Sequence, residues 1–228
     1  MASARPAVES RSAIVRDALG IGIASGAYAL SFGAISTTAG LSLLQTVELS
    51  MLMFTGASQF AMVGVIGAGG SVWAGAATAA LLGTRNALYG VRLSSLLGIR
   101  GLRRVLAAHF VIDETTAMAI ARESPPDSRF AFWATGLALF TLWNLGTLAG
   151  ALATHVLPDP KVLGFDAAPP AAFLALVAPR LRAREPMAIA LGAGVVALAV
   201  VPFVPAGIPL LIVATLVVLL GVFRRESH

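Results

Sequence analysis

Long apolar runs, separated by glycine, proline or arginine, fill most of this chain. These runs are far longer than the roughly 9–11 residues of a membrane β-strand, and none alternates with period two, so they predict α-helices. Proline-containing breaks at residues 124–127, 158–160 and 184–186 mark helix ends. The predicted helices cover residues 19–40, 43–67, 71–97, 105–120, 130–157, 165–179, 187–203 and 207–223.

The composition indicates that these helices lie in lipid. Of 228 residues, 57% are hydrophobic and only 12% are charged, and the mean hydropathy is +0.86. A bilayer core about 30 Å thick needs roughly 20 apolar residues per helix, so the chain supplies seven or eight crossings. We predict an all-α, polytopic transmembrane helix bundle, with a polar N-terminal tail at 1–18, one transmembrane domain at 19–223 and a cytoplasmic C-terminal tail at 224–228.

The charge of the chain changes this picture little. A net charge of +5 comes almost entirely from arginines in the gaps between apolar runs, where membrane topology and anionic head groups explain them better than nucleic acid does. The basic tail before residue 19 resembles a signal peptide, but the apolar run that follows is too long, which favours a retained first crossing. Cysteine is absent, which excludes disulfides, thiolate metal sites and a thiol nucleophile.

Two orientations have equal counts of basic residues. In the first, eight crossings start from a cytoplasmic N-terminus, and Arg100, Arg103 and Arg104 lie outside. In the second, the N-terminus is outside, and 105–120 enters the membrane without crossing it. Each places ten basic residues inside and four outside, so the positive-inside rule does not choose between them. Both place the C-terminus in the cytoplasm.

Two internal patterns bear on packing. Small residues recur at four-residue spacing, as in Gly22/Gly26 and Gly146/Gly150, which predicts close approach of helix backbones. The stretches 22–59 and 136–179 each contain a long helix, a short gap and an interrupted helix. Two such units in opposite orientation form the inverted repeat, with broken helices, that is common in secondary transporters.

Asp113 and Glu114 interrupt the apolar segment 105–120, and a charge at the bilayer centre costs about 2.5–3.5 kcal/mol. On a continuous helix, His109 and Asp113 share a face because they are four residues apart. Adjacent carboxylates inside a membrane can exchange protons, so these three residues are candidates for proton coupling. The alternatives are a structural ion pair with an arginine and a short segment near the interface.

A second polar group lies near the end of the third predicted helix. Arg85, Tyr89 and Arg92 are spaced to share one face, and Asn86 adjoins them. The forked guanidinium of Arg85 matches a carboxylate, either that of Asp113 or Glu114 or that of an amino acid substrate. Snorkelling to the interface explains Arg92 without a functional role.

The second predicted helix carries a polar stripe made by Glu48, Thr55 and Gln59. Gly56 and Ser58 lie within it, and a helix that loosens there would expose backbone groups to a ligand. These residues are candidates for substrate binding, with hydrogen bonding between helices as the competing explanation.

Two further groups lie toward the C-terminal half. Asn144, which shares a face with His155, is a candidate ligand or a tether between helices. Asp166, followed by Pro169 and Pro170, predicts another broken helix. Histidines lack metal-site spacing and no phosphate-binding loop is present, so we expect no catalytic site, metal, cofactor or ATP site. Energy would then come from an ion gradient or from the gradient of the substrate itself.

Four short motifs together resemble the AzlC family of branched-chain amino acid exporters. They occur in family order over residues 15–220, at residues 54–61, 85–90, 113–115 and 164–173. Gly83 and Asn86 depart from the residues that many members carry around the motif arginine, and this departure concerns the substrate more than the family.

The resemblance implies the large subunit of a secondary transporter that exports leucine, isoleucine, valine and in some members methionine. It also implies a small hydrophobic AzlD-type partner and a bacterial inner-membrane location, with efflux driven by the proton motive force. Arg85, Asn86, Tyr89, Thr55, Gly56, Ser58, Gln59 and Asn144 are then candidates for substrate binding. A passive channel for small solutes and a membrane scaffold without transport activity are the alternatives.

Overall fold

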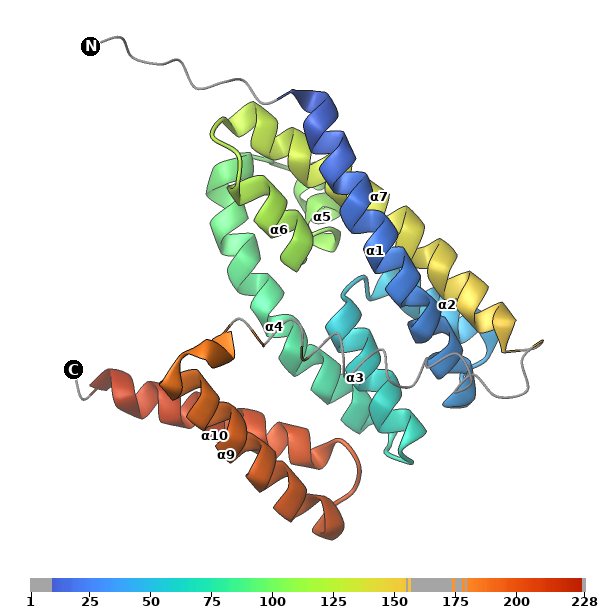
Figure 1. Ribbon diagram of the computed structural model, residues 1–228, viewed down its shortest axis with the longest axis vertical. Helices are drawn as coiled ribbons and strands as arrows, with labels where there is room; N and C mark the ends of the chain where they lie inside the picture. Colours follow the sequence, from blue (N-terminus) through green and yellow to red (C-terminus); the bar gives the residue numbers. More distant parts are fainter. Residues whose placement is uncertain (1–9, 155, 157–173, 175–177, 179, 227–228) are drawn as a thin grey trace.

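The structure is a computed structural model and describes residues 10–154, 156, 174, 178 and 180–226. This part of the chain contains nine α-helices and no strand (Figure 1), which confirms the all-α prediction. Two short 3₁₀ turns flank α9: Arg180–Arg182 precedes it and Val201–Phe203 follows it. The helices are α1 (Arg11–Thr38), α2 (Leu43–Leu52), α3 (Gly56–Gly67), α4 (Val72–Leu97), α5 (Leu102–His109), α6 (Asp113–Ile120), α7 (Pro125–Ala153), α9 (Arg184–Val200) and α10 (Ile208–Glu226).

Serine caps explain why several helices begin where they do. The side chains of Ser10, Ser42, Ser71 and Ser124 each accept a hydrogen bond from a backbone N–H in the first turn of the helix that follows. As a result, α1 and α7 begin earlier than the apolar pattern predicted. At the other end, α4 stops at Gly98, whose φ of 60° is in the left-handed region that favours glycine.

The most extensive helix contact joins α1 and α7, which lie side by side and run parallel (Figure 1). Gly22 of α1 lies against Ala138 and Leu142 of α7, and Gly33, farther along α1, lies against Thr147. Because these glycines carry no side chain, the two backbones approach closely, as the small-residue spacing predicted.

The α2–α3 pair is a hairpin that reaches only half-way along the bundle. α3 begins at Gly56, beside Trp143 in the middle of α7, and ends at Gly67, beside Ala39 at the end of α1. α2 has 10 residues and α3 has 12, so each is only about 15–18 Å long, too short to cross a core of about 30 Å. The hairpin therefore enters and leaves at the same end of the bundle.

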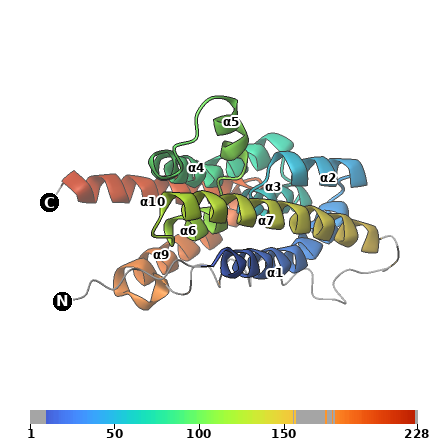
Figure 2. The same ribbon diagram turned by 90° about the horizontal axis from the view of Figure 1, so that it is seen from above.

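The α5–α6 pair forms a second hairpin that enters from the opposite end. α6 begins at Asp113, beside Arg85 in the middle of α4, and its Met118 packs on Ile14 at the start of α1. Each of its helices has eight residues. Seen from above (Figure 2), α1 lies on one side of the bundle and α5 on the other, with α7 between them.

Two predicted helices, 43–67 and 105–120, are thus each divided in two, because the chain turns back at residues 53–55 and 110–112. The inverted relation also differs from the one suggested by the sequence. Since α1 and α7 run parallel, the units of opposite orientation are α1–α3 and α4–α6. Each of them is a long helix followed by a half-length hairpin.

Neither of the two orientations proposed from the sequence matches this arrangement in full, although 105–120 turns back without crossing, as the second orientation proposed. The start of α1, the end of α4 and the start of α7 lie at one end of the bundle: Arg129 Nε donates to the carbonyl of Leu97 at 2.6 Å, and Arg122 lies 3.8 Å from Asp17. Loop and helix-end arginines among residues 10–154 all lie at this end, namely Arg11, Arg16, Arg100, Arg103, Arg104, Arg122 and Arg129.

The C-terminal helices form a separate pair. α9 and α10 pack on each other and α10 also contacts α4, while none of the residues of α9 is buried (Figure 1). By length and composition, three helical stretches in the described chain suit a membrane crossing: Arg11–Thr38, Pro125–Ala153 and Arg184–Phe203. The predicted helix at 165–179 lies outside the described residues apart from residues 174 and 178.

Candidate functional site

The tips of the two hairpins meet in the middle of the bundle. Phe54, at the tip of α2–α3, contacts the rings of His109 and Phe110 with centroid distances of 5.9 and 6.0 Å. Phe140 of α7 joins this cluster, 5.1 Å from Phe54. Apolar ring contacts thus hold two breaks in the helices against each other, and a cavity lies on either side of them.

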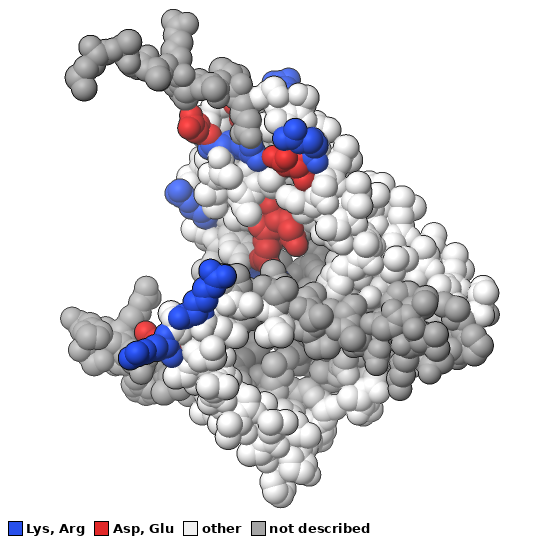
Figure 3. Space-filling model, viewed as in Figure 1, with Lys and Arg blue, Asp and Glu red and all other residues white. Residues whose placement is uncertain are grey.

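The smaller cavity, about 80 Å³, contains the ion pair of the site. Arg85 Nη1 lies 2.9 Å from Asp113 Oδ2, and the two side chains are 35% and 26% exposed. Figure 3 shows acidic side chains gathered beside a hollow in the middle of one face, where α6 begins. The cavity is lined by Ser25, Tyr28, Phe54, Thr55, Gly56, Ala57, Arg85, Ile112, Asp113, Glu114, Leu139 and Trp143.

Unpaired hydrogen-bonding groups surround this smaller cavity. Trp143 is 4% exposed, and its Nε1 has no hydrogen-bond partner; the same is true of Thr55 Oγ1, Arg85 Nε and Asp113 Oδ1. α3 also begins here without a side-chain cap and without an acidic residue in its first turn. Its first N–H groups therefore present a partial positive charge to the cavity.

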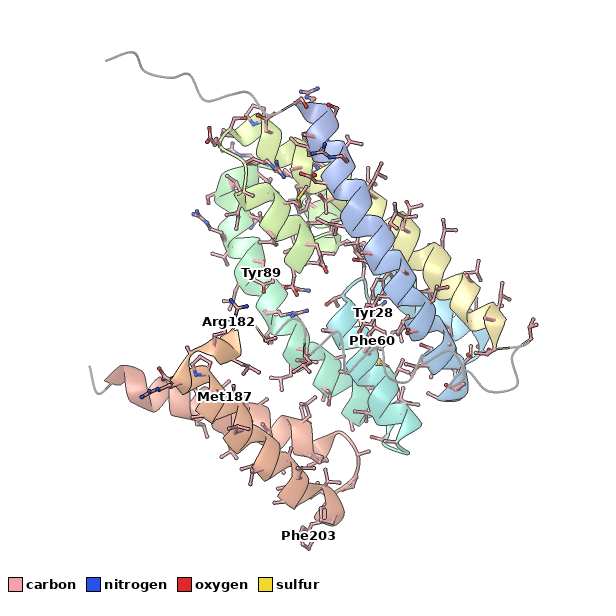
Figure 4. The ribbon with its side chains drawn as sticks, viewed as in Figure 1. Tyr28, Phe60, Tyr89, Arg182, Met187 and Phe203 are labelled. Atoms are coloured by element: carbon pink, nitrogen blue, oxygen red, sulfur yellow. The ribbon has the colours of Figure 1, made fainter. Side chains whose placement is uncertain are left out.

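Tyr28 of α1 and Trp143 of α7 form an aromatic wall of the smaller cavity, and Phe60 of α3 packs behind Tyr28. Tyr28 stacks on Phe60 with a centroid distance of 4.7 Å, and both lie in the space between α1 and α3 (Figure 4). Tyr28 also contacts Trp143, 5.9 Å away. This wall fixes the orientation of the indole, whose N–H is the unpaired donor.

The larger cavity, about 520 Å³, lies on the α4 and α5 side of the tips. Small residues of α4 make one wall, and Phe54 and Thr55 separate the two cavities because they line both. The cavity is lined by Leu52, Met53, Phe54, Thr55, Ser58, Ala76, Ala79, Ala80, Gly83, Asn86, Ala87, Gly90, Ala108, His109 and Val111.

The comparison with known proteins covers this central region. Residues 20–157, more than half of the chain, match the family described as AzlC protein. The chain belongs to the AzlC family. The inner membrane protein YgaZ of Escherichia coli (strain K12) is 32% identical over 143 residues, which are 60% of this chain and 58% of YgaZ. The chain thus spans less than two thirds of the length of this curated relative. No solved structure matches it.

Membership of the AzlC family supports a role in membrane transport, and the matched region contains both hairpins and both cavities. The structure brings together Thr55, Gly56, Arg85, Asp113 and Glu114 at the smaller cavity. It brings Ser58, Asn86 and His109 to the larger one. In the described part of the chain, no group of three or more His, Asp or Glu side chains could hold a metal ion.

The expectation that His109 and Asp113 share a helix face was wrong. The helix ends at His109 and a new one begins at Asp113, so the chain changes direction between them. As a result, His109 lines the larger cavity and Asp113 the smaller. The hydropathy of the sequence gave no sign of this break, because residues 110–112 are apolar like the residues before them.

Three other candidates line neither cavity. Asn144 donates from Nδ2 to the carbonyl of Phe140, one turn earlier, and Tyr89 packs beside Leu93 and Leu97. Gln59 is fully buried and holds the first hairpin together. Asp166, Pro169, Pro170 and His155 lie outside the described residues.

Trp143 and Tyr28 were not identified from the sequence. A signal was present for Trp143, since a tryptophan in the middle of an apolar run, away from either interface, must bury its N–H donor. Tyr28 offers the same signal in α1. Both could have been chosen on these grounds.

We expect replacement of Gln59 by methionine to destabilise the first hairpin. Gln59 Nε2 donates to the carbonyls of Leu49 at 3.0 Å and Ser50 at 3.3 Å, at the end of α2. Methionine keeps the volume but leaves both buried carbonyls with one partner fewer, so the loss should be about 2 kcal/mol. Thermal unfolding in detergent and hydrogen exchange at residues 49–59 would measure it.

Replacement of Gln45 by methionine is the matched control. Gln45 Oε1 only accepts from the exposed N–H of Ser42 in a capping box, and its loss should cost about 1 kcal/mol or less. Equal effects of the two substitutions would contradict the tethering role of Gln59.

Proposed function

We propose that this AzlC-family chain is the large subunit of a secondary transporter that exports branched-chain amino acids in exchange for protons, together with a small AzlD-type membrane subunit. The observation that carries the proposal is the smaller cavity, where the Arg85–Asp113 ion pair meets the uncapped start of α3 in the middle of the bundle. The substrate class and the partner are the ones that resemblance to AzlC exporters implies, and we propose them for this chain on that ground.

The smaller cavity is complementary to a zwitterion. A substrate carboxylate has three sets of donors available there: the first N–H groups of α3, Arg85 Nε and Trp143 Nε1. A substrate ammonium has the free Asp113 Oδ1 and the neighbouring carboxyl of Glu114. Helix ends that bind a carboxylate at mid-membrane are a recurring device of secondary transporters.

The Arg85–Asp113 pair keeps the charges of the site balanced when no substrate is bound. When the cavity holds no zwitterion, the two side chains neutralise each other across 2.9 Å. A bound zwitterion offers each of them a replacement partner, so the charges stay balanced in both states. Glu114 adjoins Asp113 and lines the same cavity, and it is the residue to which we assign the transported proton.

Transport in proteoliposomes tests the function directly. Vesicles that contain the purified chain, with and without the small subunit, are loaded with radiolabelled leucine and given a proton gradient directed inward. We expect leucine efflux that accelerates with the gradient and stops when an uncoupler collapses it. An efflux rate that the uncoupler does not change would instead support a passive channel. The absence of flux in both preparations would support a scaffold.

We expect replacement of Glu114 by glutamine to separate the two steps of the cycle. Glutamine keeps the shape of Glu114 but cannot bind and release a proton as a carboxyl group does. Leucine–leucine exchange should therefore persist, while gradient-driven efflux should fall about tenfold or more. Replacement of Glu123 by glutamine is the control, because Glu123 is an exposed carboxylate just after α6 that lines neither cavity. Gradient-driven efflux that is unchanged in the Glu114 variant would contradict the assignment of the proton.

We also infer that the chain lies in the bacterial inner membrane with its arginine-rich end in the cytoplasm. This end carries all the loop and helix-end arginines among residues 10–154, and cytoplasmic loops are enriched in arginine and lysine. The N-terminus would then be cytoplasmic, and we propose the same location for the C-terminal tail. Labelling of single cysteines introduced at residues 12 and 68 would test the first assignment, since the chain has no cysteine of its own and both positions are exposed.

A further inference from the structure

The two central cavities have opposite helix ends. α3 and α6 begin at the smaller cavity, whereas α2 and α5 end at the larger one, which is lined by Leu52 and Met53 on one hairpin and by Ala108 and His109 on the other. Helix C-termini carry a partial negative charge of roughly half an elementary charge. The hairpins therefore make the smaller cavity favourable for an anion and the larger one favourable for a cation.

Side-chain oxygens at the larger cavity lack partners, and this observation is independent of the helix ends. Ser58 is 1% exposed, and its Oγ makes no hydrogen bond; neither do Thr55 Oγ1 and Asn86 Oδ1. All three residues line the larger cavity. Thr55 and Ser58 are three residues apart at the start of α3, so they lie on the same side of its first turn.

The start of α3 explains why these hydroxyls are free. Inside a helix, a serine or threonine hydroxyl usually donates to the carbonyl four residues earlier. Thr55 precedes the first turn of α3 and Ser58 lies within that turn, so α3 has no carbonyl four residues before either of them. Gly83 faces Ser58 from α4: a Cβ there would lie 3.6 Å from Ser58 Oγ, so the glycine leaves space beside this oxygen.

The character of the cavity restricts the ligand. No carboxylate lines it, so a divalent cation would keep most of its charge uncompensated at mid-membrane. An anion would face oxygens and the negative ends of two helices. A compact monovalent cation, in contrast, is matched by neutral oxygens and helix C-termini, as at the ion sites of broken helices.

We propose that the larger cavity is a binding site for a compact monovalent cation, either an alkylammonium group or Na⁺, held by Thr55 Oγ1, Ser58 Oγ and Asn86 Oδ1. The positive charge of Arg85 does not oppose it strongly, because Arg85 lines the other cavity and is paired with Asp113. An ammonium group offers three N–H donors for the three oxygens, and Na⁺ takes the same oxygens as ligands. The site does not depend on whether the smaller cavity binds a carboxylate.

Titration of the purified full-length protein with single cations tests the site. Sodium chloride and methylammonium chloride are each added at constant ionic strength against choline chloride, whose quaternary ammonium has no N–H donor and whose methyl groups keep the charge away from the oxygens. Unfolding is followed by tryptophan fluorescence, and ²²Na⁺ binding is measured directly. We expect a saturable rise in Tm with at least one of the two cations.

Variants connect the response to these oxygens. Ser58→Ala and Asn86→Ala each remove one ligand and should weaken binding about tenfold. Gly83→Ala removes no ligand but places a methyl group beside Ser58 Oγ without a clash, and it should weaken binding even if the other variants fold poorly. Thr78→Ala is the control: Thr78 Oγ1 is also buried in α4 without a partner but lines neither cavity.

Each outcome decides the proposal. A response to Na⁺ alone identifies an inorganic ion, and a response to methylammonium alone identifies the amine of an organic ligand. Both support the site if Thr78→Ala retains wild-type affinity. The proposal is overturned if neither cation differs from choline, or if Thr78→Ala and Gly83→Ala change the affinity equally.

Discussion

Replacement of Arg85 by alanine is expected to abolish export and to lower stability at the same time. The change removes the forked donor for the substrate carboxylate, and two charge-assisted hydrogen bonds lost at the site correspond to roughly 100-fold slower efflux. It also leaves Asp113 without its partner. Because the pair is partly exposed, we expect a loss of about 2 kcal/mol, below the roughly 3–5 kcal/mol of a fully buried pair.

The double variant Arg85→Ala/Asp113→Asn separates these effects. It removes the unpaired carboxylate, so thermal unfolding in detergent should return most of the way toward the wild type, while leucine efflux should stay at the level of the single variant. A purely structural ion pair predicts the reverse, with efflux restored together with stability. Efflux in well-expressed protein, measured beside Tm, distinguishes the two.

Replacement of Gly33 by alanine should strongly destabilise the fold. A Cβ at Gly33 would overlap the carbonyl oxygen of Thr147 and the backbone nitrogen of Ala151. Neither backbone group can move without separating α1 from α7, so we expect a loss of about 3 kcal/mol. Thermal unfolding of the purified protein and its yield in membranes would measure the loss.

Gly20 provides the control in the same helix. A Cβ at Gly20 would meet no atom within 4 Å, so Gly20→Ala should be neutral or stabilise the helix by up to about 1 kcal/mol. If both alanine variants unfold at the wild-type temperature, the close contact between α1 and α7 does not determine stability.

Local signals predicted much of the fold. The apolar runs located α1, α4 and α7, and the glycine spacing predicted close backbone packing, which the structure places between α1 and α7. The polar stripe and Gly56 indicated the break before α3. Arg85 and Asp113 could be identified because charges are rare inside apolar runs, and the structure places them within hydrogen-bonding distance.

The direction of the chain after each break could not be predicted. Hydropathy is equal whether an apolar helix continues or turns back, so 43–67 resembled a crossing and 105–120 was compatible with either a crossing or a segment that does not cross. What reverses the first is Gln59, which binds the carbonyls of Leu49 and Ser50 across the hairpin. What reverses the second is the Thr115 hydroxyl, which donates to the carbonyl of Phe110 at 2.6 Å. Such contacts depend on the folded geometry and leave no periodic pattern in the sequence.

The paired hairpins have a consequence for mapping the topology of this protein. A count based on hydropathy would treat 43–67 as a crossing and assign the loops on both sides of α4, at residues 68–71 and 98–101, to the wrong faces of the bilayer. The second hairpin, counted in the same way, would then reverse the assignment again, so that the loop before α7 and α7 itself are placed correctly. Because the two errors cancel, a reporter fused after α7 would give the same result for the true and the mistaken topology. Only probes in the short loops on either side of α4 distinguish the two.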